Sequence, residues 1–425
     1  MGFIDNSLSD VKLPKIVKVC QYFDKNKIED IEGCVRQCMK NSLAYQRINP
    51  GQRIAVTAGS RGIDNIALIT KIVCFMIKEK GAVPFIVPAM GSHGGATAKG
   101  QLHMLEINGM TEETMGVPIL SSMETAMIGE LENGDSVYID KNAHEADGIV
   151  LINRVKAHTS FKGKYESGLM KMMTIGLGKQ YGAQHYHQRG YGFMPWVIEN
   201  VGKRVLVSSK IICGIAVVEN GYGKTNIIEC IDAADIPRRE AELLIESYKH
   251  LSRPFFKEAD VMVVKEIGKN ISGVGCDSNI SGRFNNEHFH NDIHITRVGF
   301  LELSKKSDGN ANGMGLADFI TQKFYDNVDF EQTYPNALTS TATVNVKVPM
   351  ILSNDKNLFA VAVKTSCIAD FDNVRLAIIE SSKNMTTIYV SENMAEEAIA
   401  AGMEVCGEPF EIPFSKEGAL ELKFL

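Results

Sequence analysis

The feature that most limits the fold of this chain is a pattern of strand, glycine turn and helix that starts at residue 53 and then repeats. Residues 53–58, RIAVTA, predict a buried strand that runs into the turn GSRG, and an amphipathic helix follows up to Gly81. A second strand, VPFIVPAM, ends in the turn GSHGG, and a helix begins near Ala96. This alternation predicts a parallel sheet with crossover helices, and therefore an α/β protein.

The rest of the chain indicates a second domain of the same class. Apolar runs at 147–155 and 211–219 predict further strands, residues 235–250 a polar helix, and 259–268 a restart of the strand-to-glycine-loop pattern. We expect this alternation to continue in the runs 337–352, 375–380 and 386–391. Because 425 residues are too many for one ordinary core, we predict two α/β domains with mostly parallel sheets, 1–253 and 254–425.

Charge and composition exclude several classes of partner. The net charge of −6 gives no electrostatic footprint for nucleic acid, and no apolar run reaches the length of a membrane span. The first fifteen residues do not resemble a signal peptide. Nine scattered cysteines without paired metal-site spacing indicate reduced thiols. We therefore expect a cytoplasmic protein that binds a small molecule, with no nucleic-acid or membrane partner.

Four glycine-rich loops follow predicted strands, and each carries a cation or a histidine. They are 58–64 with Gly59, Ser60 and Arg61, 90–97 with His93, 154–163 with His158, and 265–277 with Lys269. Ligands of open parallel sheets bind beyond the carboxyl ends of the strands, where such loops offer backbone N–H groups to an anion. The four loops together predict a shared crevice. A solvated turn histidine at 93, a locally bonded one at 158 and a surface arginine at 61 are the alternatives.

Lys171 lies in the apolar stretch ESGLMKMMTIG, an unusual position for an ammonium group. Apolar surroundings lower the pKa of a lysine and make it a nucleophile, whereas the alternative is a side chain that reaches solvent along a helix edge. The neighbouring lysines, 156, 162 and 164, are expected to be solvated turn residues. Downstream, His185 and His187 share one face and could bind one metal in an extended segment, but diverge in a helix.

The order of GSRG, GSHGG, KAHTSFKGKYESGLMK and HYH resembles the nickel-dependent lactate racemase family. The resemblance is dense over residues 53–190 and implies two α/β domains with the active site in the cleft between them. It also implies a nickel-pincer nucleotide, pyridinium-3-thioamide-5-thiocarboxylic acid mononucleotide, tethered to a lysine. Nickel would be held by this cofactor and one histidine, two more histidines would form an acid/base pair, and cofactor-biosynthesis proteins would be partners.

Carried over to this chain, the resemblance assigns each role to a residue. Lys171 becomes the tether, His187 the nickel ligand with His185 as the substitute, and His93 and His158 the acid/base pair. Arg61, with Gly59 and Ser60, would contact the cofactor phosphate, and Lys269 would bind the substrate carboxylate. The chain departs from the family at Ala58, where an acidic residue is usual, and by a longer interval between His158 and Lys171 that contains residues 164–166, KYE.

The implied reaction is racemisation or epimerisation of a 2-hydroxy acid by reversible hydride transfer to the cofactor. Two bases on opposite sides of a planar 2-keto acid explain the need for two histidines. Two alternatives remain at this point: a pyridoxal-phosphate enzyme with Lys171 as its Schiff-base lysine, and a non-catalytic homologue that binds a nucleotide or anion.

Overall fold

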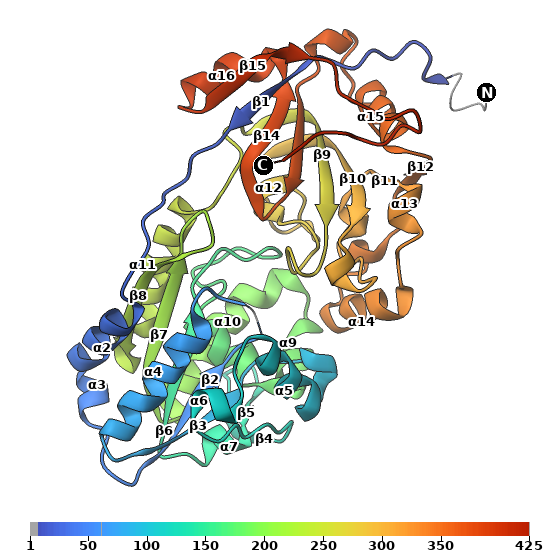
Figure 1. The fold of residues 1–425 in the computed structure, drawn as a ribbon. Helices are drawn as coiled ribbons and strands as arrows, with labels where there is room; N and C mark the ends of the chain where they lie inside the picture. Colours follow the sequence, from blue (N-terminus) through green and yellow to red (C-terminus); the bar gives the residue numbers. More distant parts are fainter. Residues whose placement is uncertain (1–6, 61, 425) are drawn as a thin grey trace. The chain divides into compact units, whose positions relative to one another are not determined.

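The computed structural model describes residues 7–60 and 62–424, which form two compact units (Figure 1). The central unit comprises Asp24–Leu251, and the terminal unit combines the chain up to Phe23 with Ser252–Leu425. The division between the units falls between Leu251 and Ser252. The range 1–253 differs from the central unit at its start, because strand β1 (Ile16–Cys20) pairs with strands β14 (Asn384–Ser391) and β15 (Glu404–Phe410) of the terminal unit.

The central unit is built on a five-stranded sheet with the order β3-β2-β6-β7-β8. All neighbours are parallel except β7 and β8. The strands are β2 (Arg53–Ala58), β3 (Val83–Pro88), β6 (Gly148–Arg154), β7 (Ile211–Glu219) and β8 (Thr225–Asp232). The first four coincide with the strands predicted from apolar runs. A separate antiparallel pair consists of β4 (Thr125–Glu130) and β5 (Ser136–Asp140).

Helices cover both faces of this sheet, as continuous burial along β2 requires (Figure 1). On one face, Ile54 and Val56 of β2 pack in one core with Ile69 and Val73 of α4. The opposite face carries α8, where Leu169 packs so closely on β7 that only a glycine, Gly214, fits beneath it. The helices of the unit are α2 (Ile31–Asn41), α3 (Leu43–Gln46), α4 (Ile66–Glu79), α5 (Ala98–Ile107), α6 (Glu112–Met115), α7 (Lys141–His144), α8 (Leu169–Lys171), α9 (Lys179–His187), α10 (Met194–Ser208) and α11 (Ile236–Lys249).

The terminal unit contains an eight-stranded mixed sheet with the order β12-β11-β10-β9-β13-β14-β1-β15. The pairs from β12 to β13 are parallel, and those from β13 to β15 are antiparallel. The further strands are β9 (Glu258–Ile267), β10 (His294–Leu303), β11 (Phe319–Thr321), β12 (Met350–Leu352) and β13 (Leu376–Ser381). The helices are α12 (Ser278–Ser281), α13 (Gln322–Tyr325), α14 (Phe330–Ser340), α15 (Asp355–Lys364) and α16 (Ala395–Ala400).

Two details of this unit differ from the sequence prediction. The run 337–352 contributes only the short strand β12, because α14 extends to Ser340 and a 3₁₀ turn occupies Thr343–Val346. Strands β13 and β14 form an antiparallel hairpin rather than a parallel pair with a crossover helix. The α/β class with mostly parallel sheets is nevertheless confirmed. Within residues 7–60 and 62–424, no helix is long and apolar enough to cross a membrane.

Candidate active site

Three of the four predicted loops lie at one edge of the central sheet. They follow β2, β3 and β6, which are adjacent and parallel, so their carboxyl ends meet at the same edge. The fourth loop follows β9 in the sheet of the terminal unit. Three of the four loops thus share one sheet edge and the fourth belongs to the second sheet, so the crevice shared by all four stays a prediction.

His93 lies in the loop after β3, and its ring is oriented by the backbone. Its Nδ1 is 2.8 Å from the carbonyl oxygen of Met90, so the Nδ1–H donates a hydrogen bond. In the neutral ring, Nε2 is then the unprotonated nitrogen. The same loop is tied down by Gln101 of α5, a fully buried amide whose Nε2 donates to the carbonyls of Gly91 and His93, at 2.8 and 3.3 Å.

A buried ion pair is hydrogen-bonded to the residues that hold the His93 loop in place. Lys179 and Asp140 are both fully buried, and their Nζ and Oδ2 atoms lie 2.9 Å apart. Lys179 also donates to the carbonyl of Pro88 at 2.5 Å and to Oε1 of Gln101 at 3.2 Å. Burial lowers the pKa of Lys179, while Asp140 opposes that shift. The cation thus connects the end of β3, the amide that holds the loop, and β5.

The loops after β2 and β3 both pack on η2 (Met172–Gly176), a single π-helical turn that continues α8. The N–H of Gly91 donates to the carbonyl of Gly176, and a side chain at Gly91, which has φ +60°, would meet Ile175 at 3.2 Å. A Cβ at Gly59 would lie 3.4 Å from Cε of Met172. Close packing at these glycines places both loops against the turn that follows Lys171.

Lys171 is the last residue of α8, a short helix whose first turn is hydrogen-bonded to a buried carboxylate. Glu240 of α11 is 1% exposed and accepts the N–H of Met170 at 2.9 Å. Burial raises the pKa of Glu240 to about 7, although the N–H groups of Met170 and Leu169 favour its ionised form. Lys171 itself is half-buried, whereas Leu169, Met170, Met172 and Met173 are buried. The methionines around Lys171 are therefore core residues, and the lysine emerges at their edge.

One aromatic ring connects Lys171 to His158. The Nζ of Lys171 lies 5.3 Å from the ring centroid of Phe161, within the range of a cation–π interaction. The ring of His158 stacks on the same phenylalanine, with the centroids 4.1 Å apart. The predicted tether and the predicted base thus both contact one buried side chain.

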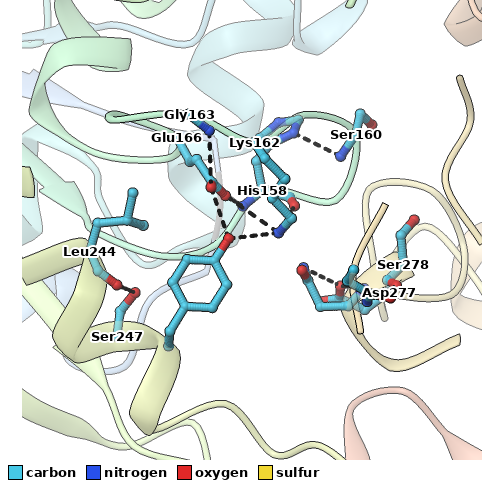
Figure 2. Close-up of polar contacts among 12 residues, drawn as sticks. His158, Ser160, Lys162, Gly163, Glu166, Leu244, Ser247, Asp277 and Ser278 are labelled. Atoms are coloured by element: carbon cyan, nitrogen blue, oxygen red, sulfur yellow. Dashed lines mark hydrogen bonds and ion pairs between the residues drawn. The ribbon is translucent and has the colours of Figure 1, made fainter. Parts of the chain in front are cut away.

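The loop residues around His158 fix its position (Figure 2). Its backbone N–H donates to Oε2 of Glu166 at 2.6 Å, and its Nδ1 accepts the N–H of Ser160 at 3.0 Å. A neutral His158 therefore carries its proton on Nε2, the opposite tautomer from that of His93. Glu166 is buried, which raises its pKa, and Lys162 opposes the shift from 3.6 Å.

Two features of this loop correct the sequence interpretation. Lys162 is not a solvated turn residue: its Nζ donates to the hydroxyl of Tyr248 at 2.7 Å and to the carbonyl of His158 at 3.3 Å. The KYE stretch supplies anchors, because the Tyr165 hydroxyl donates to the carbonyl of Pro237 and Glu166 binds the N–H of His158. Tyr248 completes the group by donating to Glu166 at 2.8 Å.

The two candidate metal ligands diverge, since both lie on the helix α9. The extended segment that would place both on one metal is therefore wrong. His185 is directed toward the Asp135 carboxylate, at 3.5 Å. Burial and, to a smaller extent, the nearby ammonium of Lys171 together lower the pKa of His187 to about 4, so His187 is neutral at pH 7. A neutral imidazole is the form that binds metals.

The last predicted residues are Arg61, Ser60 and Lys269. Arg61 is not among the described residues, and Ser60 precedes it in a half-buried bend. Lys269 belongs to the terminal unit, where its Nζ donates to the carbonyl of Gly273 at 3.1 Å and to the side chain of Asn336.

Sequence reasoning missed the residues that position the site: Gln101, Asp140, Glu166, Lys179, Glu240 and Tyr248. Only Lys179 left a local signal, since it follows the apolar stretch TIGLG in the way that Lys171 follows GLM. The other five are ordinary polar residues of loops, helices and a strand, and no sequence pattern links them to the groups that they bind.

Comparison with known proteins places these observations in a family. Residues 4–192 match the lactate racemase N-terminal domain family. Over these residues the chain is similar to the lactate racemase family. A comparison with curated protein sequences finds no match.

Two solved structures resemble the fold. The lactate racemase apoprotein from Thermoanaerobacterium thermosaccharolyticum superposes with a TM-score of 0.52 at 13% sequence identity, over 86% of this chain and 98% of that one. A protein from Thermotoga maritima gives a TM-score of 0.47 at 13% identity, over 66% of this chain and 72% of that one. At this identity the likeness to the racemase concerns the fold.

Proposed function

We propose that the protein is a racemase or epimerase of a 2-hydroxy acid that uses a nickel-pincer nucleotide tethered to Lys171. The observation that carries the proposal is the cluster around Lys171. Phe161 contacts both this lysine and His158, and His187 is near enough for the lysine ammonium to lower its pKa. His93 lies in a loop that packs on the turn following Lys171.

The residues of the central unit fit the requirements of such a cofactor. An amine at the edge of an apolar helix suits a covalent tether, and a neutral imidazole at His187 suits a metal with an open position. The glycine loop at residues 59–62 offers backbone N–H groups of the kind that bind phosphate. When bound, the cofactor would supply a ring that accepts and returns a hydride. Loading would require cofactor-biosynthesis proteins as partners, and we keep a cytoplasmic location as part of the proposal.

The two histidines have different resting roles. His93 presents an unprotonated Nε2 and takes the proton of the substrate hydroxyl, whereas His158 holds a proton on Nε2. To act as the second base, His158 must move that proton to Nδ1, which requires the N–H of Ser160 to leave this nitrogen. The group formed by Glu166, Lys162 and Tyr248 holds the His158 backbone in place during the exchange.

The test is the mass, metal content and activity of protein made together with the cofactor-producing proteins. We expect an adduct on Lys171 that contains sulfur, one nickel per chain, and loss of optical rotation for a 2-hydroxy acid in a substrate screen. Lys171→Arg should remove the adduct, and His187→Ala should reduce nickel while the adduct remains. An aldehyde adduct released by hydroxylamine would instead indicate a pyridoxal-phosphate enzyme, and an unmodified chain that binds nucleotide would indicate a non-catalytic homologue.

The acid/base pair is tested in the loaded protein. His93→Ala and His158→Ala should each lower racemisation by at least roughly 10²-fold, because each removes one proton-transfer group. The lysine adduct and nickel should be unchanged in both variants, and His185→Ala serves as the matched control with normal activity. Full activity in either variant would contradict the two-base assignment.

A further inference from the structure

A group of three metal-binding side chains lies in the terminal unit, on two strands that are far apart in the sequence. Cys20 belongs to β1, while Glu404 and Cys406 belong to β15. One possible ligand atom from each residue lies within 4.8 Å of the other two. Among residues 7–60 and 62–424 this is the one such group of three histidine, cysteine or acidic side chains.

The register of the two strands explains why the three side chains meet. In the antiparallel pair, Cys20 is directly opposite Glu404 and Lys18 is opposite Cys406. Opposite and diagonal neighbours share one face of a sheet, so the two thiols and the carboxylate project from the same face. The three Cα atoms are thus fixed by paired backbone, and only side-chain rotation is needed to bring the ligand atoms together.

The distances suit a metal better than a disulfide. The two sulfur atoms are 3.3 Å apart, compared with about 2.05 Å in a disulfide. Two thiolates on a tetrahedral Zn²⁺ with Zn–S bonds of about 2.3 Å lie about 3.8 Å apart, which needs an adjustment of only about half an ångström. All nine cysteines of the chain are free thiols.

The surroundings of the group include Lys18 opposite Cys406, an outer partner for one ligand, and access to solvent. Tyr22 donates its hydroxyl to the Glu404 carboxylate and orients it, as an outer partner orients a metal ligand. Glu404 forms no ion pair with any residue in 7–60 or 62–424. The strand β15 is at the edge of the sheet, Glu404 is exposed and both cysteines are half-buried, so solvent can supply a fourth ligand.

We propose that Cys20, Cys406 and Glu404 form a binding site for a divalent cation of the zinc class. Two thiolates and one carboxylate are ligands that Zn²⁺ accepts, and three protein ligands leave one position for water. The site lies in the terminal unit and is built from residues other than those proposed to hold nickel. It would join the edge strand β15 to β1. None of its three residues takes part in the reaction proposed for the central unit, so the two proposals can fail independently.

The test is titration of the reduced full-length chain with Co²⁺, whose thiolate charge-transfer absorption reports sulfur ligands. We expect one Co²⁺ per chain with this absorption, displaced by an equivalent of Zn²⁺. Cys20→Ser and Cys406→Ser should abolish the absorption, and Tyr22→Phe should weaken binding by roughly tenfold. Glu404→Gln, at an exposed position that does not endanger the fold, should weaken binding by a similar factor or more.

Two cysteines provide matched controls. Cys367→Ser, at an exposed thiol of the same unit, and Cys38→Ser, in α2 of the central unit, should leave the absorption and affinity unchanged. The proposal would be overturned by the absence of the absorption in the reduced wild type, or by its persistence in Cys20→Ser. Isolation of the chain with a Cys20–Cys406 disulfide that forms in preference to metal binding would overturn it as well.

Discussion

At the scale of single residues, the chemical role of each histidine depends on which of its ring nitrogens is hydrogen-bonded to the backbone. His93 donates from Nδ1 to a carbonyl and His158 accepts at Nδ1 from an N–H, so two identical residue types have opposite proton positions. Because a ring nitrogen cannot both hold a proton and accept one, the backbone decides which histidine is ready to take a proton. His187 differs from both, since burial and Lys171 keep it neutral.

The two tautomers can be measured directly. In ¹⁵N-labelled protein at a pH where both rings are neutral, the imidazole spectra should show His93 protonated at Nδ1 and His158 at Nε2. The variants His93→Ala and His158→Ala assign the signals, and His144, an exposed histidine at the end of α7, gives the reference for a mixture of tautomers. The same tautomer in both histidines would contradict the unequal resting roles.

At the scale of elements, the short helix α8 and the loop after β3 are both held in place by buried polar side chains. Helix α8 has three residues and begins on the Glu240 carboxylate. The loop after β3 is held by Gln101 and by the pair of Lys179 and Asp140. Lys179 also has a positive φ of 54°, a conformation that a residue with a side chain adopts only where its surroundings require it.

The Glu240 carboxylate should make the central unit less stable as the pH rises. Its pKa is about 7 in the folded chain and near 4.5 when unfolded, so the folded state holds the proton more tightly. This stability is complete below pH 4.5 and is lost as the pH rises through 7, by roughly 3 kcal/mol. Because the lowered pKa of His187 changes stability in the opposite direction, the loss is measured as a difference between variants. Unfolding followed by the fluorescence of Trp196, the single tryptophan, should show the stability of the wild type relative to Glu240→Gln decreasing by this amount between pH 4.5 and 7.

The matched control for this pH effect is Glu242→Gln on the same helix. Glu242 is exposed, and Arg239 and Arg238 lower its pKa, so its contribution does not decrease with rising pH. The control should therefore retain the pH dependence of the wild type. Retention of that dependence in Glu240→Gln would instead exclude Glu240 as its source.

Substitutions in the buried pair of Lys179 and Asp140 should affect stability and activity differently. Lys179→Met leaves Asp140 buried without its cation and should cost roughly 3–5 kcal/mol of unfolding free energy. The double variant Lys179→Met/Asp140→Leu should recover most of this stability, since it removes both charges. It should not recover racemisation, because the hydrogen bonds to Pro88 and Gln101 stay absent.

These two outcomes are measured by chemical denaturation and by kcat in the loaded enzyme. A double variant with both normal stability and normal kcat would show that the ion pair has no positioning role. The control is Lys141→Met, which breaks an exposed pair with Glu124 and should change unfolding free energy by less than about 1 kcal/mol.

At the scale of the whole molecule, the terminal unit is formed by two separate segments of the sequence. The strand β1, near the N-terminus, pairs in the sheet that is otherwise formed by the C-terminal half. The strand β1 lies between β14 and β15, where Ile16 and Val19 are fully buried. The edge strand β15 therefore reaches the rest of the sheet only through β1. It follows that the terminal unit can complete its sheet only after both ends of the chain have been made.

The two units should respond separately to core substitutions. Ile16→Ala should destabilise the terminal unit by roughly 2–5 kcal/mol, the usual cost of such a cavity. Circular dichroism should show this loss, whereas the Trp196 signal, which reports the central unit, should move much less. The matched variant Ile54→Ala in β2 should shift the Trp196 transition instead. Equal shifts of both signals in Ile16→Ala would show that the units unfold together.

Much of the central unit could be predicted from local patterns. Apolar runs and glycine turns between residues 53 and 97 indicated β2, α4 and β3 within a few residues, because side-chain periodicity and turn chemistry act over short distances. The predictions at 337–352 and at the β13–β14 hairpin were wrong, because an apolar run does not specify its pairing partner.

The sequence by itself determined the α/β class and, over residues 4–192, the resemblance to the lactate racemase family, from which the residues expected to carry the chemistry follow. Only the tertiary structure decided that His185 and His187 point apart, that Glu166 holds His158, and that Lys179 supports the His93 loop. It also brought Cys20 and Cys406 together across 386 positions of the chain. The physical reason is that local preferences fix an element, whereas contacts between distant side chains arise from the register and packing of elements already formed.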